Sequence, residues 1–406
     1  MTSDNSTTSS GSGIPVSKST PSKPSMMNNP VYRALFFQAV ILGGVIAAGV
    51  YIVGNTMDNL ARQGIASGFG FLDSTSGFAI IMHLIEYSES STHGTVFLVG
   101  LLNTLIVSLF SIVLATILGF IIGVARLSNN WLISKIATVY IEVIRNIPLL
   151  LQIFFWYFGV VRNLPSPKKS IELMDSFFLN NRGLYSPSPV PESGFSSVII
   201  AFIIGIVATI IISRWAHKRQ DATGQQFPVF FTALGLIIGL PLLALLVTGF
   251  PVTWDYPALK GFNFQGGMVI IPEFASLALA LSIYTAAFIA EIVRAGITAV
   301  SGGQSEAAHA LGLRNGPTLR LVIIPQALRV IIPPLTSQYL NLTKNSSLAT
   351  AIAYPDMVSV FAGTTLNQTG QAVEVLAITM AVYLTISLSI SAFMNWYNNK
   401  MALVER

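Results

Sequence analysis

The sequence EIVRAGITAVSGGQSEAAHALGLRNGPTLRLVIIP, from Glu291 to Pro325, is the one long polar interruption in a strongly apolar C-terminal half. Within it, Ser305 to Leu311 contains good helix formers, and Gly312 then favours the end of that helix. Pro317 and Pro325 limit the following segment, because proline lacks the amide that a continuing helix uses. The stretch predicts a short polar helix between two membrane spans.

One face of this predicted helix is small and apolar. Ala307, Ala308 and Leu311 are three or four residues apart, and residues at that spacing share a helix face. With Glu306 beside it, such a ridge suits a groove in a partner protein. An ordinary alanine-rich surface helix is the simpler interpretation of Glu306-Ala307-Ala308 alone, so the wider context has to decide.

The composition is that of a polytopic membrane protein. Of 406 residues, 52% are hydrophobic and only 10% are charged, and the mean hydropathy is +0.67. A soluble domain carries about a quarter charged residues. The net charge of +5 comes mostly from basic residues beside apolar runs, where they set orientation. The chain has no cysteine, which excludes disulfides and thiolate sites.

Apolar runs of about 20 residues, the length that crosses about 30 Å of hydrocarbon, predict eight spans with both termini in the cytoplasm. Their approximate ranges are 34–53, 95–125, 136–161, 197–213, 227–248, 272–291, a span that begins near 321, and 373–397. The run Arg214 to Arg219 is the strongest cytoplasmic marker. Residues 1–30, rich in Ser, Thr, Pro and Asn, predict a disordered tail.

Three local features are predicted within this topology. Gly119 and Gly123 are one helical turn apart, a small-residue pattern that lets another helix approach closely. The polar segment after the first span predicts an external loop with an interfacial helix around Phe78 to Tyr87. Pro148 is expected to loosen the third span, and Pro333-Pro334 to break the seventh.

Strongly polar residues at membrane depth are costly and usually face a bundle interior or a pathway. They gather in the third span, at the lower end of the sixth beside Thr285, and after the paired prolines. The candidate pathway residues are Glu142, Arg145, Asn146, Tyr284, Asn341, Lys344, Asn345 and Ser346.

Two of these groups have an alternative interpretation. Glu142 and Arg145 are three residues apart and suit a structural ion pair as well as a transport role. Lys344 suits contact with a substrate carboxylate and equally a position at the membrane interface. Glu291 and Arg294 are expected to be interfacial and supportive.

The sequence makes no case for an enzyme active site. His309 has no second histidine at metal-binding spacing, and no Ser/His/Asp set is evident. A G-x-x-x-x-G-K-[ST] phosphate loop is absent, so any nucleotide has to be bound by another polypeptide.

At the quoted stretch the chain resembles the permease subunits of ATP-binding-cassette (ABC) importers. Their cytoplasmic signature is Glu-Ala-Ala, three residues, Gly, nine residues, Ile, one residue, Leu-Pro. Glu306-Ala307-Ala308, Gly312 and Pro325 fall at this spacing, with Val322 and Ile324 as conservative departures. The resemblance implies a coupling helix around 301–316 that docks on an ATPase subunit, with Glu306, Ala307, Ala308, Leu311 and Gly312 as its coupling residues.

Other stretches are similar to a narrower group, the polar-amino-acid permeases. Tyr140 to Gln152 resembles an element that usually reads Arg-Gly-Thr-Pro, but Asn146 and Ile147 stand where that form has Gly and Thr. This departure resembles the larger permeases of general L-amino-acid importers, as do Asn180 to Gly183 and Asn367 to Gln371. The resemblance covers about 103–157 and 273–397.

The resemblance implies an all-α polytopic fold with a five-helix type I permease core. The core comprises residues 94–162 and 270–406, with an extra N-terminal helix at 31–56 and a periplasmic loop plus inserted helix pair at 163–269. The implied partners are a second related permease in a heterodimer, two ATPase subunits that bind ATP and Mg²⁺, and a periplasmic amino-acid-binding protein. No cofactor on this chain and no nucleic acid are implied, and the expected location is the bacterial inner membrane.

Two other functions remain open at this stage. One is a secondary amino-acid transporter driven by an ion gradient, for which Glu142 is the best candidate for a proton relay. The other is a membrane scaffold or sensor, against which the polar spans argue.

Overall fold

The computed structural model describes residues 30–62, 64 and 67–401. It divides into two units, residues 1–67 and 68–406. The first unit contains α1 (Pro30–Arg62), whose apolar run Tyr32–Thr56 is 25 residues long and suffices to cross a membrane. Apart from Pro30, the predicted disordered tail lies outside the described residues.

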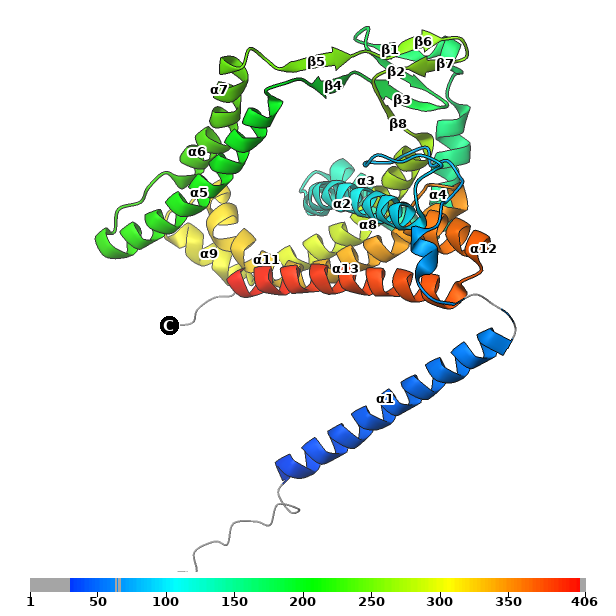
Figure 1. Cartoon of the computed structure of the whole chain (residues 1–406). Coiled ribbons are helices and arrows are strands. Elements are labelled where there is room, and N and C mark those ends of the chain that lie inside the picture. Colours follow the sequence, from blue (N-terminus) through cyan, green and yellow to red (C-terminus); the bar gives the residue numbers. More distant parts are fainter. Residues whose placement is uncertain (1–29, 63, 65–66, 402–406) are drawn as a thin grey trace, which may run out of the picture. The chain divides into compact units, whose positions relative to one another are not determined.

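The core of the second unit is a set of packed apolar helices (Figure 1). Helix α8 is central: it contacts α2, α3, α4 and α11, and α11 in turn contacts α13. About 67% of the apolar window of α8 is buried, a larger share than in any other described span. The core helices are α2 (His93–Arg126), α3 (Trp131–Asn146), α4 (Leu149–Phe154), α8 (Pro272–Thr298), α11 (Ile324–Asn345) and α13 (Ala372–Met401).

Glycines set the closest approach between these helices. A Cβ on Gly119 would lie 2.6 Å from Cβ of Ile289, and one on Gly123 would lie 2.7 Å from the carbonyl oxygen of Ala290. Gly296 of α8 is equally tight, since its Cβ would lie 2.3 Å from Ile331 of α11. The predicted small-residue contact of α2 is confirmed, and α8 is the helix that approaches it.

The third span is broken at Pro148. Helices α3 and α4 are bent by 105° at the break, and Ile147 is extended, as the residue before a proline prefers to be. The side-chain amide of Gln152 donates to the carbonyls of Ile144 and Ile147, at 3.0 Å each, and so satisfies two groups at the end of α3. The π-helix η3 (Phe155–Val160) and the 3-10 turns η4 (Val161–Asn163) and η5 (Pro167–Lys169) follow.

The expected break at Pro333-Pro334 is wrong, because α11 continues through both prolines. Ile331, Ile332 and Leu335 around them are buried, and this tertiary packing holds the helix despite two missing amide donors. Short helical segments lie before and after α11. They are α10 (Asn315–Thr318) and η7 (Leu319–Ile323) before it, and η8 (Ser346–Ile352), η9 (Met357–Thr365) and α12 (Leu366–Thr369) after it.

The interfacial helix predicted around Phe78 to Tyr87 is also wrong. After the short turn η2 (Gly70–Asp73) this segment is irregular, and side chains hold its backbone. The Tyr87 hydroxyl donates to the Phe78 carbonyl at 2.5 Å, and the Asn103 amide donates to the Met82 carbonyl at 2.8 Å. Side-chain hydrogen bonds of this kind compete with helix formation.

Between the two parts of the core, residues 163–269 form small sheets and a helix pair. Helix α5 (Phe195–Thr223) packs on α6 (Val229–Leu234), η6 (Gly235–Gly239) and α7 (Leu240–Val247). Strands β1 (Ile171–Leu173), β2 (Phe177–Asn180), β3 (Gly183–Ser186) and β8 (Met268–Ile270) make an antiparallel sheet in the order β1-β2-β3-β8. Two further ribbons pair β4 (Ser188–Pro191) with β5 (Val252–Asp255) and β6 (Ala258–Lys260) with β7 (Asn263–Gln265). The apolar runs of the sequence predict the helix pair, but its residues gave no prediction of these strands.

Counting the bent pair, up to eight helical segments of the described chain are long and apolar enough to span a membrane, which confirms the predicted polytopic fold. The short polar helix α9 (Gly302–Ala310) lies between the spans that contain α8 and α11.

A buried carboxylate caps the turn between the last two spans. Asp356 is fully buried at the start of η9, and its Oδ1 accepts from the Ser359 amide at 2.8 Å. Burial raises the pKa of Asp356 from its ordinary value of 3.8 to about 7, because the ionised form loses its water.

We predict that Gly119→Ala destabilises the chain. The added Cβ overlaps Ile289, and overpacking of this kind costs about 1–3 kcal/mol. Thermal unfolding in mild detergent measures the effect. Gly235→Ala is the matched control, because nothing lies within 4 Å of its added Cβ and alanine is the better helix former. Equal melting temperatures for the two variants would contradict the packing assignment.

The pH dependence of stability tests the burial of Asp356. Its raised pKa means that the folded chain binds the proton more tightly than the unfolded chain, so stability falls as pH rises from about 4 to about 7. We predict that Asp356→Asn, which keeps the cap but does not ionise, loses less thermal stability over this range than the natural sequence. Parallel pH profiles for the two proteins would refute this explanation.

Candidate functional site

A cavity of about 280 Å³ lies between α8 and α11. Tyr284, Asn341 and Asn345, three of the predicted pathway residues, line it together. The two asparagines are four residues apart and share one face of α11. The full lining is Tyr284, Thr285 and Phe288 from α8, and Gln338, Asn341, Leu342 and Asn345 from α11.

Arg145 borders this cavity through an aromatic side chain. Its guanidinium carbon lies 5.0 Å from the ring centroid of Phe288, a distance at which a cation is attracted to the ring face. The neighbouring Asn146 is engaged within its own helix, where its amide donates to the carbonyl of Glu142 at 2.6 Å. Positive charge therefore lies beside the cavity without lining it.

The local pairing of Glu142 with Arg145 is not formed. Instead, a carboxylate oxygen of Glu142 lies 3.8 Å from Arg126 of α2. Arg126 also pairs with Glu291, which is 2.6 Å from Arg294 on its own helix. This cluster ties α2, α3 and α8 together, and it gives Glu291 and Arg294 the supportive role that was expected.

Besides Glu142, Arg145 and Asn146, two more of the predicted pathway residues do not line the cavity. Lys344 is exposed and is not among the lining residues. Ser346 is fully buried, and its hydroxyl donates to the carbonyl of Thr343 at 2.7 Å. The transport roles proposed for these two residues stay predictions.

Three lining residues, Phe288, Gln338 and Leu342, were not predicted from the sequence. Gln338 precedes Asn341 by three residues and Asn345 by seven, so helical spacing was a usable signal for it. Phe288 had no such signal, because an aromatic residue in an apolar span looks the same whether it lines a cavity or faces lipid.

The predicted polar helix is present as α9, and its residues lie within the predicted range of 301–316. Its last residue is Ala310, and Gly312 two residues later has a φ of +78°, a left-handed conformation that glycine adopts without strain. The amide of Leu313 donates to the carbonyl of Ala308 at 3.1 Å and that of Gly312 to His309 at 2.9 Å, which satisfies the last carbonyls of the helix.

The apolar ridge of α9 is only partly buried. Ala308 is buried, and α9 contacts η7 and α10. Glu306 and Ala307 are exposed, and Leu311 is 82% exposed. Glu306, Ala307 and Leu311 therefore lie on the exposed surface of α9 and its C-cap.

A hydrogen bond connects α9 to the helix that lines the cavity. The side-chain amide of Gln326, near the start of α11, donates to the side chain of Gln304 at 3.2 Å. This contact joins α9 to the start of α11.

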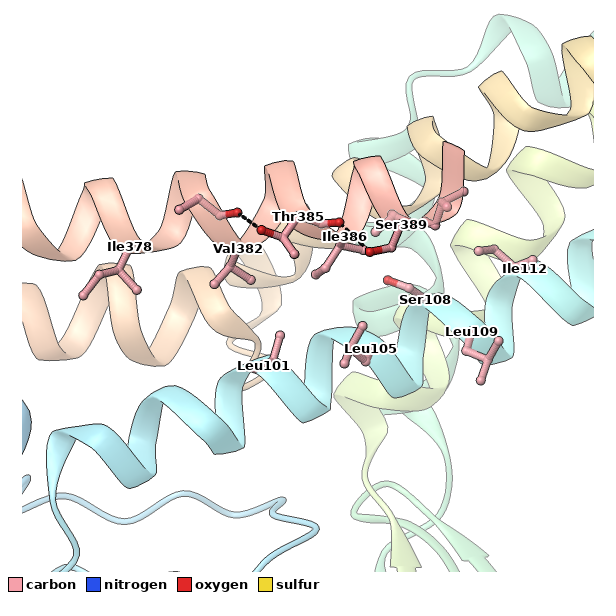
Figure 2. A pocket seen from close by; sticks show the side chains of 13 residues that line it. Leu101, Leu105, Ser108, Leu109, Ile112, Ile378, Val382, Thr385, Ile386 and Ser389 are labelled. Atoms are coloured by element: carbon pink, nitrogen blue, oxygen red, sulfur yellow. Dashed lines mark hydrogen bonds between the residues drawn. The ribbon is translucent and has the colours of Figure 1, made fainter. Parts of the chain in front are cut away.

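Another groove, of about 780 Å³, runs between α2 and α13 (Figure 2). Leucine and isoleucine side chains line most of it, with Ser108, Thr385 and Ser389 among them. Thr385 and Ser389 donate to carbonyls of their own helix at 2.7 and 2.8 Å. This surface is suited to lipid chains or to another apolar helix and offers little to a polar solute.

Comparison with known proteins places these features in context. The sequence pattern of the family described as "Binding-protein-dependent transport system inner membrane component" matches residues 115–403.

Three similar proteins are matched over nearly their whole length. "Putative amino-acid ABC transporter permease protein YhdX" of Escherichia coli is 59% identical over 93% of this chain and 96% of its own. "General L-amino acid transport system permease protein AapQ" of Rhizobium johnstonii is 57% identical over 94% and 95%. "Glutamate/glutamine/aspartate/asparagine transport system permease protein BztB" of Rhodobacter capsulatus is 44% identical over 92% and 95%.

Proposed function

This chain belongs to the family of binding-protein-dependent transport system inner membrane components, and from that premise we propose that it is the permease subunit of an ATP-driven importer of L-amino acids. It is a multi-pass inner membrane protein and a transport subunit, not an enzyme. In the proposal, substrate passes the cavity between α8 and α11, and α9 couples that cavity to a separate ATPase.

The proposal rests on the link between α9 and the cavity. The exposed face of α9 and the cavity are linked by one helix, because Gln326 at the start of α11 binds Gln304 of α9, and Asn341 and Asn345 further along α11 line the cavity. An importer of this kind needs ATP and substrate to favour different conformations of the same element. Helix α11 is in contact with both sites and is the element we assign to that role.

The lining of the cavity supports an amino acid as the transported solute. Gln338, Asn341 and Asn345 present amide groups, which donate hydrogen bonds to a carboxylate and accept them from an ammonium group. Two of the relatives are named for the transport of general L-amino acids and of glutamate, glutamine, aspartate and asparagine. We propose a substrate from the same class for this chain.

The proposed assembly follows the family. It contains a second, related permease as the heterodimeric partner, two ATPase subunits that bind ATP and Mg²⁺, and a periplasmic amino-acid-binding protein. We place both termini in the cytoplasm, because the basic residues of Arg214 to Arg219 and Lys400 follow apolar spans on that side. We assign no cofactor to this chain.

The alternative is a secondary transporter that uses Glu142 as a proton relay. The structure favours it less, because the Glu142 side chain is 59% exposed, lies beside Arg126 and does not line the cavity. A relay would have to exchange protons along the route of the solute.

The first test addresses coupling. We predict that Glu306→Lys leaves the transporter in the membrane but lowers ATP-driven amino-acid uptake by at least about tenfold, because a reversed charge on the exposed face of α9 disfavours docking of the ATPase. Uptake into proteoliposomes and recovery of the ATPase during purification are the measurements. Glu172→Lys, the same reversal at an exposed site on β1, is the control. Normal uptake by Glu306→Lys at a normal protein level would contradict the assignment of α9 as the coupling helix.

The second test addresses the cavity. We predict that Asn341→Leu raises the substrate concentration needed for half-maximal uptake by about tenfold, since it removes a polar group that contacts the solute and keeps a similar volume. Recovery of the ATPase should not change. Asn395→Leu, the same substitution at an exposed position of α13, should behave like the natural sequence. A similar effect of both variants on uptake would remove Asn341 from the pathway.

A further inference from the structure

The segment between the two parts of the core contains a second polar cavity, of about 490 Å³. It shares no lining residue with the cavity between α8 and α11. Its walls combine the small sheet with the start of α8, and its polar lining includes Arg162, Arg182, Tyr185, Asn263 and Glu273. The volume is within the range typical of small-molecule sites.

Hydrogen bonds and close packing hold the turn that contains Arg182. Asn180 is fully buried, its Oδ1 accepts from the Arg182 amide at 2.8 Å, and its Nδ2 donates to Ser170 at 3.0 Å. Gly183 has φ of +130°, and a Cβ there would lie 2.4 Å from the carbonyl oxygen of Ile270. The backbone amide of Asn181 donates to the Pro165 carbonyl at 3.0 Å. Packing and hydrogen bonds therefore hold the backbone on both sides of Arg182 in one conformation.

The charged groups of this cavity do not form ion pairs with one another. Among the described residues, no ion pair within 4.0 Å involves Arg162, Arg182 or Glu273. Arg162 lies 5.9 Å from the ring centroid of Tyr157, and the hydroxyl of the same tyrosine donates to Oε1 of Glu273 at 2.7 Å. Two guanidinium groups and one oriented carboxylate thus line a single cavity.

We propose that this cavity is a second amino-acid-binding site, in which Arg162 and Arg182 bind carboxylate groups and Glu273 binds the ammonium group. Guanidinium groups bind carboxylates by paired hydrogen bonds, and a carboxylate accepts those of an ammonium group. The three side chains sum to one positive charge, which favours an acidic amino acid with two carboxylates over a neutral one. The ligand class rests on the proposed import of amino acids.

The site adjoins the end of the core helices. A neighbouring cavity of about 210 Å³ is lined by segments around Ile80 and Pro355, and both cavities include Ile81, Ile271 and Glu273 in their walls. A bound amino acid would therefore be held next to the core and apart from the pathway cavity. An acidic side chain of the binding protein offers the same carboxylate chemistry from another source, and the experiment separates the two.

The absence of cysteine from this chain permits a direct measurement. Val269→Cys places a thiol in the cavity wall, and maleimide modification of this chain is followed by mass spectrometry in the assembled transporter in nanodiscs, without binding protein. We expect L-glutamate to slow the modification. Arg182→Gln and Arg162→Gln should each raise the glutamate concentration required by at least about tenfold, because each removes a charge-assisted hydrogen-bond donor.

Three controls sharpen this result. Lys260→Gln, which removes an exposed cation outside the cavity, should leave the protection by glutamate unchanged, and so should Asn341→Leu in the pathway cavity. Glu273→Gln should weaken protection by L-glutamate but not by glutarate, which lacks the ammonium group. Equilibrium binding of radiolabelled L-glutamate to the natural sequence and to Arg182→Gln supplies a second measurement that does not depend on the introduced cysteine.

The outcomes are distinct. The site is overturned if free amino acids do not protect the introduced cysteine from maleimide, or if Arg182→Gln leaves that protection intact. Protection by the binding protein alone shows a docking surface instead. Normal ATP-driven uptake without protection overturns this inference and leaves the proposed function standing. Protection without ATP-driven uptake contradicts the proposed function and leaves the site.

Discussion

The close packing of α2 on α8 is the contact on which the rest of the core depends. Lipid tails are as apolar as leucine, so membrane helices associate mainly through close van der Waals packing and hydrogen bonds between them. Gly119 and Gly123 let the backbones meet, and α8 then becomes the central helix. Its position places Tyr284 and Phe288 opposite α11 and brings Glu291 to Arg126, so both the cavity and the ion cluster follow from this one contact.

The continuity of α11 matters for the same reason. In the proposed function, the uninterrupted helix would carry a displacement at its start to Asn341 and Asn345. The π-helix η7 and the 3-10 helix η8 lie outside this stretch. The hydrogen bond from Gln326 to Gln304 joins α9 to the start of this helix.

The inserted segment, residues 163–269, also depends on α8 for its cavity. Its sheet is stabilised by backbone pairing and by the buried Asn180, and it delivers Arg182 to a cavity that the start of α8 completes. Helix α8 therefore contributes to both polar cavities, with Glu273 in its first turn and Tyr284 near its middle.

By itself the sequence determined the features that depend on neighbours along the chain. Apolar length predicts the spans, helix formers before Gly312 predict α9, Pro148 predicts the bend, and the spacing from Glu306 to Pro325 identifies the family. These signals are local, because hydropathy, periodicity and proline chemistry act over a few residues.

Only the tertiary structure decided the partners of residues far apart in the chain. It pairs Glu142 with Arg126, adds Gln338 and Phe288 to the cavity between α8 and α11, and keeps α11 continuous through its prolines. It also brings Arg182 and Glu273 to one cavity. Which helix faces meet depends on packing over the whole bundle, and no local pattern of residues encodes that.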